Sequence, residues 1–218
     1  MVGCLICGGA CRGHRVCWDH WAAFQALGWH GQRLLCDLGE LRPAFSVWPR
    51  QRDPPPVEQP AEVVRGLFIG DLDDAADADR LQLLGVNFVV NLCPEQLQGP
   101  YAGLCARLAS RGIRQVLWPA DDSGAYDIVE EVLARGVFES IDVALLHGKV
   151  LVCCWGGCNR SGAVVAGYLV SRRRFALRAA MALLQQCRGT VLTTGYFRYL
   201  LVRASLLPDG PLADPRSV

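Results

Sequence analysis

The chain has 218 residues, 51% of them hydrophobic, and a formal net charge of +1 at pH 7. This length exceeds one average domain of about 100 to 150 residues but falls short of two, so we expect one main core and a smaller appendage. The near-zero net charge gives no reason to expect nucleic acid as a partner. No apolar run approaches the roughly 18 residues that a membrane span requires, so we expect no membrane partner.

Cysteine usage bears on the expected compartment. The N-terminus lacks the charged and apolar regions of a secretory signal, so we expect a cytoplasmic protein, with the nucleus as the alternative. In that reducing compartment the 11 Cys residues are expected to be thiols, metal ligands or redox groups rather than disulfides.

The first segment of the chain, residues 1–48, is rich in Cys and His. It holds a Cys-x2-Cys pair and then a Cys-x2-His pair, which are Cys4 with Cys7 and Cys17 with His20. Two such pairs supply the four sulfur and nitrogen ligands of a tetrahedral structural zinc ion. The segment resembles small zinc-finger knuckles of the treble-clef or ribbon kind.

Two other interpretations of this segment stay open. Cys11 and His14 have the same x2 spacing and compete as ligands. Alternatively, the segment docks on the rest of the chain without metal. A segment this short has little core of its own, so metal binding would supply its folding energy. It is also a candidate binding site for a protein partner.

A proline-rich stretch, residues 49–61, reads as an extended linker. After it, short apolar runs alternate with amphipathic segments. The expected strands are 67–70, 86–93, 113–118 and 150–153. The expected helices are 74–85, 101–111, 125–147, 161–174, 176–187 and 195–207. We therefore expect an α/β domain over 62–207, with a central, mostly parallel sheet flanked by helices, and a tail over 208–218.

The last expected strand runs directly into a loop, in the sequence VLVCCWGGCNRSG of residues 150–162. The thiol of Cys154 begins this loop, and Arg160 ends it at the start of the next helix. Ligands of such sheets bind at the carboxyl ends of strands, where this loop lies. Loop N–H groups and a helix N-terminus favour an anion, and a guanidinium can bind two phosphoryl oxygens at once.

The same donors should lower the pKa of Cys154 below the roughly 8.5 of a free thiol. The stretch therefore predicts a nucleophile built into a phosphate-binding loop. The loop residues expected to contact the phosphate are Trp155, Gly156, Gly157, Cys158, Asn159 and Arg160.

The loop resembles the Cys-x5-Arg-Ser signature of the protein tyrosine phosphatase superfamily, here Cys154 to Ser161. Three further stretches are similar to dual-specificity phosphatases: LFIG at 67–70 to their opening strand, PADDSGAYDI at 119–128 to their general-acid loop, and RGTVLTTGYFRYLL at 188–201 to their closing helix. The resemblance covers about residues 62–207. It implies a dual-specificity phosphatase fold and a hydrolase that needs no cofactor for catalysis.

The resemblance also implies a role for each matched residue. Cys154 is the nucleophile that accepts the phosphoryl group, and Arg160 holds that group through the transition state. Ser161 hydrogen-bonds the thiolate. Asp122 protonates the leaving oxygen and then activates water. Asp121 is the weaker candidate for this carboxyl.

Two neighbouring positions have more ordinary interpretations. Asp127 is expected to be a helix-start residue. Most of the superfamily has His immediately before the nucleophile, whereas this chain has Cys153. Cys153 is expected to be a buried strand residue, and the alternative is that it or Cys158 protects Cys154 from oxidation.

Three functions follow from this sequence. The first, which we expect, is hydrolysis of phosphotyrosine and phosphoserine/threonine in proteins through a phosphocysteine intermediate. The second is a catalytically weak module that binds phosphoproteins, which the missing His favours. The third is a member of the superfamily that acts on a non-protein phosphate ester. Phosphorylated proteins are thus the expected substrates.

Overall fold

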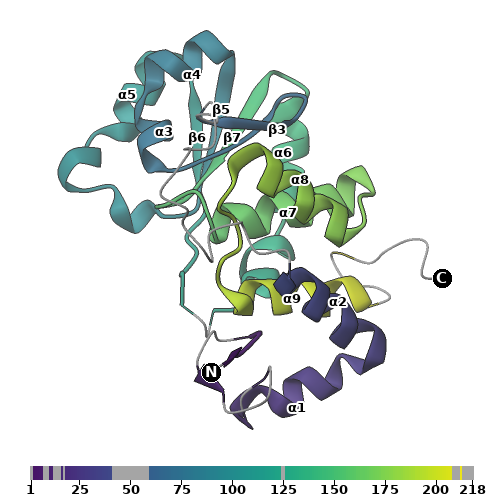
Figure 1. Ribbon diagram of the computed structural model, residues 1–218. Helices are drawn as coiled ribbons and strands as arrows, with labels where there is room; N and C mark the ends of the chain where they lie inside the picture. The colour runs from purple at the N-terminus through teal and green to yellow at the C-terminus, as the bar shows by residue number, and fades with distance from the viewer. Residues whose placement is uncertain are drawn as a thin grey trace, which may run out of the picture.

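The computed structural model describes residues 2–6, 10–11, 16, 18–40, 59–123, 126–207 and 212. Figure 1 shows a sheet with helices on both sides, and the N-terminal segment lying against the last helix. In this part of the chain, no helix combines the length and the apolar character that crossing a membrane requires.

The central sheet has five strands in the order β3-β4-β7-β5-β6. Their bounds are β3 Ala61–Val64, β4 Leu67–Gly70, β5 Val86–Asn91, β6 Arg114–Leu117 and β7 Lys149–Cys153. β3 runs antiparallel to β4, and all other neighbours are parallel. The expected mostly parallel sheet is therefore correct, and β3 makes it a mixed one. A tight turn in which Gly66 has a φ of 84° joins β3 to β4 as a hairpin.

The helices of this part cover both faces of the sheet. In chain order they are α3 Leu72–Ala76, α4 Ala78–Leu84, α5 Leu104–Ser110, α6 Val137–Leu145, α7 Arg160–Arg173, α8 Leu177–Arg188 and α9 Gly195–Leu206. Shorter helical turns are η2 Pro94–Gln96, η3 Gly99–Tyr101 and the π-helical η4 Val129–Leu133. Figure 1 shows α3, α4 and α5 on one side of the sheet and α6, α7 and α8 on the other.

Two expected helices are each divided in the structure. The helix expected over 74–85 is part of the pair α3 and α4, because Asp77 accepts a hydrogen bond from Arg80 N at 2.9 Å and so caps a new helix. The helix expected over 125–147 is interrupted between η4 and α6 at Gly136, whose φ is 98°. Local capping and glycine conformation thus overrode the apolar periodicity.

β7 and α7 form the centre of the core. Leu151 and Val152 of β7 are completely buried, and every residue of α7 from Arg160 to Val170 is buried. Burial on both faces explains why the sequence on each side of the loop is continuously apolar rather than alternating. These two buried elements fix both ends of the loop at the carboxyl edge of the sheet.

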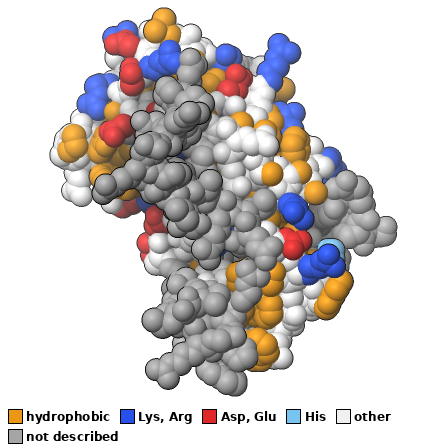
Figure 2. Space-filling view, in the orientation of Figure 1, with side chains coloured by type: hydrophobic (Ala, Val, Ile, Leu, Met, Phe, Trp, Pro, Cys, Tyr) orange, Lys and Arg blue, Asp and Glu red, His pale blue; other side chains and the backbone are white. Residues whose placement is uncertain are grey.

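The N-terminal segment packs on α9. It comprises β1 Val2–Gly3, β2 Ala10–Cys11, α1 Trp18–Ala26 and α2 Gly28–Glu40. A Cβ on Gly31 of α2 would lie 2.5 Å from Leu206 Cδ1 of α9, so the two helices are in close contact there. Figure 2 shows exposed hydrophobic side chains over this part of the molecule, and Trp29 of α2 is exposed.

The expected zinc site lies only partly within the described residues. Cys7 and Cys17 are outside them, as is the competing His14. Cys4 is buried, and His20 is half-buried on α1. Among the described residues, no group of three or more His, Cys, Asp or Glu could hold a metal ion. The Cys/His-rich zinc module therefore stays a prediction, as does the linker over 49–61, which is described only from residue 59.

Candidate active site

Three carbonyl groups of the loop between β7 and α7 accept hydrogen bonds from neighbouring segments of the chain. The carbonyl of Trp155 accepts from Leu72 N at 3.4 Å, and that of Cys158 accepts from Leu192 N at 3.1 Å. The carbonyl of Gly157 accepts from Arg188 Nε at 3.0 Å.

Unlike these carbonyl groups, the N–H groups of residues 155–159 make no hydrogen bonds within the described part of the chain. They and the N-terminus of α7 are therefore available to an anion.

Cys154 and Ser161 lie at the two ends of this loop. Cys154 Sγ is 3.3 Å from Ser161 Oγ, within hydrogen-bond range for sulfur. Cys154 is 2% exposed and Ser161 is completely buried. A hydroxyl in this position can donate to a thiolate and so stabilise its negative charge.

Arg160 is held on one side of its guanidinium. Nη1 donates to Ala120 O at 3.0 Å and pairs with Glu95 Oε1 at 2.9 Å. Nε is buried, has no hydrogen-bond partner among the described residues, and is 4.0 Å from Asp122 Oδ2. A buried N–H group without a partner is costly, so this side of the guanidinium is suited to a ligand oxygen.

The loop that carries Asp122 is anchored to the edge of the sheet. Ala120 N donates to Leu92 O at 3.1 Å, and Tyr126 Oη donates to Pro119 O at 3.2 Å. Burial raises the pKa of Asp122 above its usual value, although Arg160 opposes this shift. A carboxyl with a raised pKa next to the phosphate site can act as a general acid.

The other candidate carboxyls are less suitable. Asp121 is exposed. Asp127 accepts from Val129 N at 3.1 Å at the start of η4 and also pairs with Arg203. The expectation that Asp127 is a helix-start residue is therefore confirmed.

Comparisons with known proteins agree with this arrangement. Residues 67–204 match the family model described as "Dual specificity phosphatase, catalytic domain". The chain belongs to the dual-specificity phosphatase family. Dual specificity protein phosphatase 26 of Rattus norvegicus is 32% identical over 152 residues, which cover 68% of this chain and 69% of the rat protein.

Two more similarities support the family. Dual specificity protein phosphatase 4 of Homo sapiens is 29% identical over 136 residues, covering 61% of this chain and 31% of the human protein. The crystal structure of human DUSP28 superposes with a TM-score of 0.53 and 26% identity, over 69% of this chain and 93% of that one. The protein is thus a dual-specificity protein phosphatase, a cysteine-based hydrolase that acts on phosphorylated proteins.

In this phosphatase, Cys153 occupies a fully buried position at the end of β7. Burial raises its pKa well above the usual thiol value, so it is a neutral thiol. The expectation of a buried strand residue is confirmed. The thiol of Cys158 contacts two polar side chains, because its Sγ is 3.6 Å from Thr193 Oγ1 and 3.8 Å from Asn159 Oδ1.

Two residues next to the loop were missed in the sequence analysis. One is Glu95, which pairs with Arg160. Its only signal in the sequence is that it closely follows β5, on the edge of the sheet where the loop lies.

The other is Arg188 at the end of α8. Besides bonding Gly157 O, it pairs with Asp71 at 3.0 Å and with Asp74 at 3.2 Å. Burial raises the pKa of Asp74 to about 6, with Arg188 opposing the shift. Nothing in the sequence predicts the contact of Arg188 with the loop.

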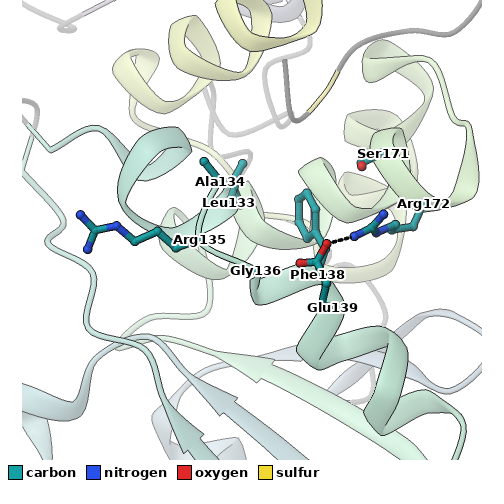
Figure 3. A pocket seen from close by; sticks show the side chains of 8 residues that line it. All are labelled: Leu133, Ala134, Arg135, Gly136, Phe138, Glu139, Ser171 and Arg172. Carbon is teal, nitrogen blue, oxygen red and sulfur yellow. Dashed lines mark hydrogen bonds and ion pairs between the residues drawn. The ribbon is translucent and has the colours of Figure 1, made fainter. Parts of the chain in front are cut away.

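A pocket lies away from this site. It has a volume of about 580 Å³ and is lined by residues of η4, α6 and the last turn of α7, among them Phe138, Glu139 and Arg172. Figure 3 shows Glu139 and Arg172 paired across it. Arg172 is twelve residues along α7 from Arg160, a rise of about 18 Å, so this pocket is separate from the phosphate-binding loop.

Proposed function

We propose that Cys154 performs the phosphatase reaction as the nucleophile. Its thiolate attacks the phosphorus of the substrate, so that an S–P bond forms as the bond from phosphorus to the leaving oxygen breaks. Asp122, in its protonated form, gives its proton to that oxygen. Water then attacks the phosphorus of the phosphocysteine while the Asp122 carboxylate takes a proton from that water. The S–P bond breaks, which releases phosphate and restores the Cys154 thiolate.

Arg160 is proposed to bind the phosphoryl group through both steps. The observation that carries the proposal is its guanidinium, which is held at Nη1 and left without a partner at Nε, beside Asp122. Charge on the equatorial oxygens is stabilised best by donors that are already oriented. The unused N–H groups of residues 155–159 supply further donors of this kind.

Ser161 is proposed to stabilise the departing thiolate in the second step. Its support is the 3.3 Å distance between Ser161 Oγ and Cys154 Sγ. Loss of this hydroxyl should slow breakdown of the phosphocysteine more than its formation, because the thiolate is the leaving group only in the second step.

The test uses two variants at the proposed reacting groups. Cys154→Ser should abolish turnover and still bind phosphate or vanadate. Asp122→Asn should slow a substrate with a poor leaving group far more than one whose leaving group needs no proton. Turnover that survives Cys154→Ser would refute the mechanism.

The alternative is a weak phosphoprotein-binding module, which Cys153 in place of His favours. It predicts that phosphopeptides bind to the wild-type protein but are not hydrolysed. The same turnover measurement on the wild-type protein therefore separates the two functions.

We also propose that the N-terminal segment binds about one zinc ion through Cys4, Cys7, Cys17 and His20. Two features support this: Ile6 N donates to Cys4 Sγ at 3.4 Å, as expected where a Cys-x2-Cys turn holds a metal, and α1, which carries His20, begins directly after Cys17. Metal analysis of the full chain and of the variant Cys4→Ser, His20→Ala tests it. Equal zinc in both would contradict the proposal.

We place the enzyme in the cytoplasm or the nucleus. The proposed mechanism supports this, because the Cys154 nucleophile must stay reduced and those compartments keep thiols reduced. Fluorescence imaging of the tagged protein is the test, and an exclusively secreted product would contradict it.

A further inference from the structure

Carboxylates that follow three of the parallel strands lie around the proposed active site: one in α3, one in η2 and one in a loop. Asp73 follows β4, Glu95 follows β5 and Asp121 follows β6. Parallel strands present their carboxyl ends at one edge of the sheet, so the segments that follow β4, β5 and β6 lie around the loop that follows β7.

Asp73 is connected to the phosphate-binding loop through two aromatic side chains. It accepts a hydrogen bond from Tyr101 Oη at 2.6 Å. The rings of Tyr101 and Trp155 form a T-shaped pair with 5.9 Å between their centroids, and Trp155 directly follows the nucleophile. Asp73 therefore lies beside the entrance rather than inside it.

The cation at the entrance does not neutralise these carboxylates. Glu95 and Asp122 share Arg160. In the part of the chain that the structure describes, neither Asp73 nor Asp121 has an ion-pair partner. The entrance thus carries excess negative charge, while the buried Arg160 Nε inside it lacks a partner and is ready for a phosphoryl oxygen.

Trp155 adds a second receptor for cations. Trp155 is 53% exposed, although it is one residue from the buried Cys154. An exposed indole face binds an Arg or Lys side chain by a cation–π interaction. A phosphorylated segment that presents its phosphate inward and cations to the rim therefore fits both parts of the entrance.

We propose that this phosphatase prefers protein segments in which Arg or Lys residues flank the phosphorylated residue, and that it discriminates against acidic or multiply phosphorylated segments. The preference rests on the proposed function, because it concerns the entrance to the same site. Opposite charges at the rim lower the free energy of the bound substrate, and like charges raise it.

The experiment compares two phosphotyrosine peptides that differ only in carrying Arg or Asp on both sides of the phosphotyrosine. The kcat/KM ratio should favour the Arg peptide by about tenfold or more at low salt, since several weak pairs act together. This ratio of kcat/KM for the Arg peptide to that for the Asp peptide should fall markedly at about 0.5 M salt, where exposed charges are screened.

Two variants and a matched control locate the effect. Asp73→Asn keeps an acceptor for Tyr101 Oη, and it and Asp121→Asn should each lower the ratio by about threefold. Glu139→Gln removes the same charge from α6, where Glu139 pairs with Arg172 about 18 Å of helix rise from the loop, and should leave the ratio unchanged.

The small substrate p-nitrophenyl phosphate separates failure of this preference from failure of the proposed function. If the enzyme hydrolyses it but shows equal kcat/KM for the two peptides, favours the Asp peptide, or hydrolyses neither, the preference is wrong and the chemistry stands. An equal effect of Glu139→Gln on the ratio would also overturn it. If p-nitrophenyl phosphate is not hydrolysed at all, the proposed function itself fails.

Discussion

Gly157 is the position in the phosphate-binding loop where one added methyl group should do most damage. Its φ is 62°, and a Cβ there would lie 2.2 Å from Arg188 Nη2 and 2.7 Å from Gly70 C. Arg188 can move, but the Gly70 carbon belongs to the backbone at the end of β4 and cannot. Left-handed backbone costs a residue with a Cβ about 1 to 2 kcal/mol.

The overpacking adds to that penalty. Inserting a methyl group into a filled space costs about 1 to 3 kcal/mol, so Gly157→Ala should lose about 2 to 5 kcal/mol of unfolding free energy. For a chain of this size each kcal/mol lowers the Tm by about 2 to 4 °C. We therefore expect the Tm to fall by about 4 to 20 °C.

Gly156→Ala is the matched control, because a Cβ on Gly156 meets nothing within 4 Å and its φ is not in the left-handed region. Thermal unfolding followed by circular dichroism compares the two variants with the wild-type protein. Gly156→Ala should stay within about 2 °C of the wild type, which is the usual range for a surface change. Equal Tm values for the two variants would refute the packing described for Gly157 and Arg188.

Three further outcomes follow from the titrating groups. Because burial raises the pKa of Asp122, its acid form should persist to a higher pH than in an ordinary aspartic acid. Asp122→Asn should therefore remove the basic limb of the kcat/KM–pH profile, and a basic limb that remains would belong to another group. Cys153→His should raise kcat/KM, because an imidazolium next to the Cys154 thiolate stabilises the negative charge of the nucleophile, and an unchanged kcat/KM would contradict this. Arg188→Met should lower the Tm more at pH 8 than at pH 5. The pKa of Asp74 is raised to about 6 in the folded protein, so its buried carboxylate destabilises the fold as the pH rises through that value, and loss of Arg188 raises this pKa further. Equal losses at both pH values would show that Arg188 does not stabilise the Asp74 carboxylate.

The chemistry of the site could be predicted because its parts are adjacent in the sequence. Cys154, Arg160 and Ser161 lie within one strand–loop–helix unit, and both flanking elements are apolar runs of the right length. Asp122 was predicted through the resemblance of its loop, not through any local pattern, and its role stays a proposal. The mostly parallel sheet followed from the alternation of strands and helices.

What the sequence analysis missed depends on contacts between distant residues or on local conformation. β3 joins the sheet through the turn at Gly66, and its four residues are too few to show a period. The break at Asp77 depends on side-chain capping, which competes with the apolar pattern of the surrounding helix. Arg188 reaches Gly157 across 31 residues, and no spacing rule connects an arginine at a helix end with a particular carbonyl.

The carboxylates at the entrance were not predicted from the sequence, although their positions follow a simple rule. Asp73, Glu95 and Asp121 are far apart in the sequence, yet each lies three or four residues after the end of a parallel strand. Because those strand ends converge, charge at these offsets accumulates around the nucleophile that follows β7. A net charge of +1 for the whole chain conceals this local excess of negative charge, since it sums over all faces. The proposed preference of this phosphatase for segments flanked by Arg or Lys therefore rests on the charges that follow successive strands and not on the total charge of the chain.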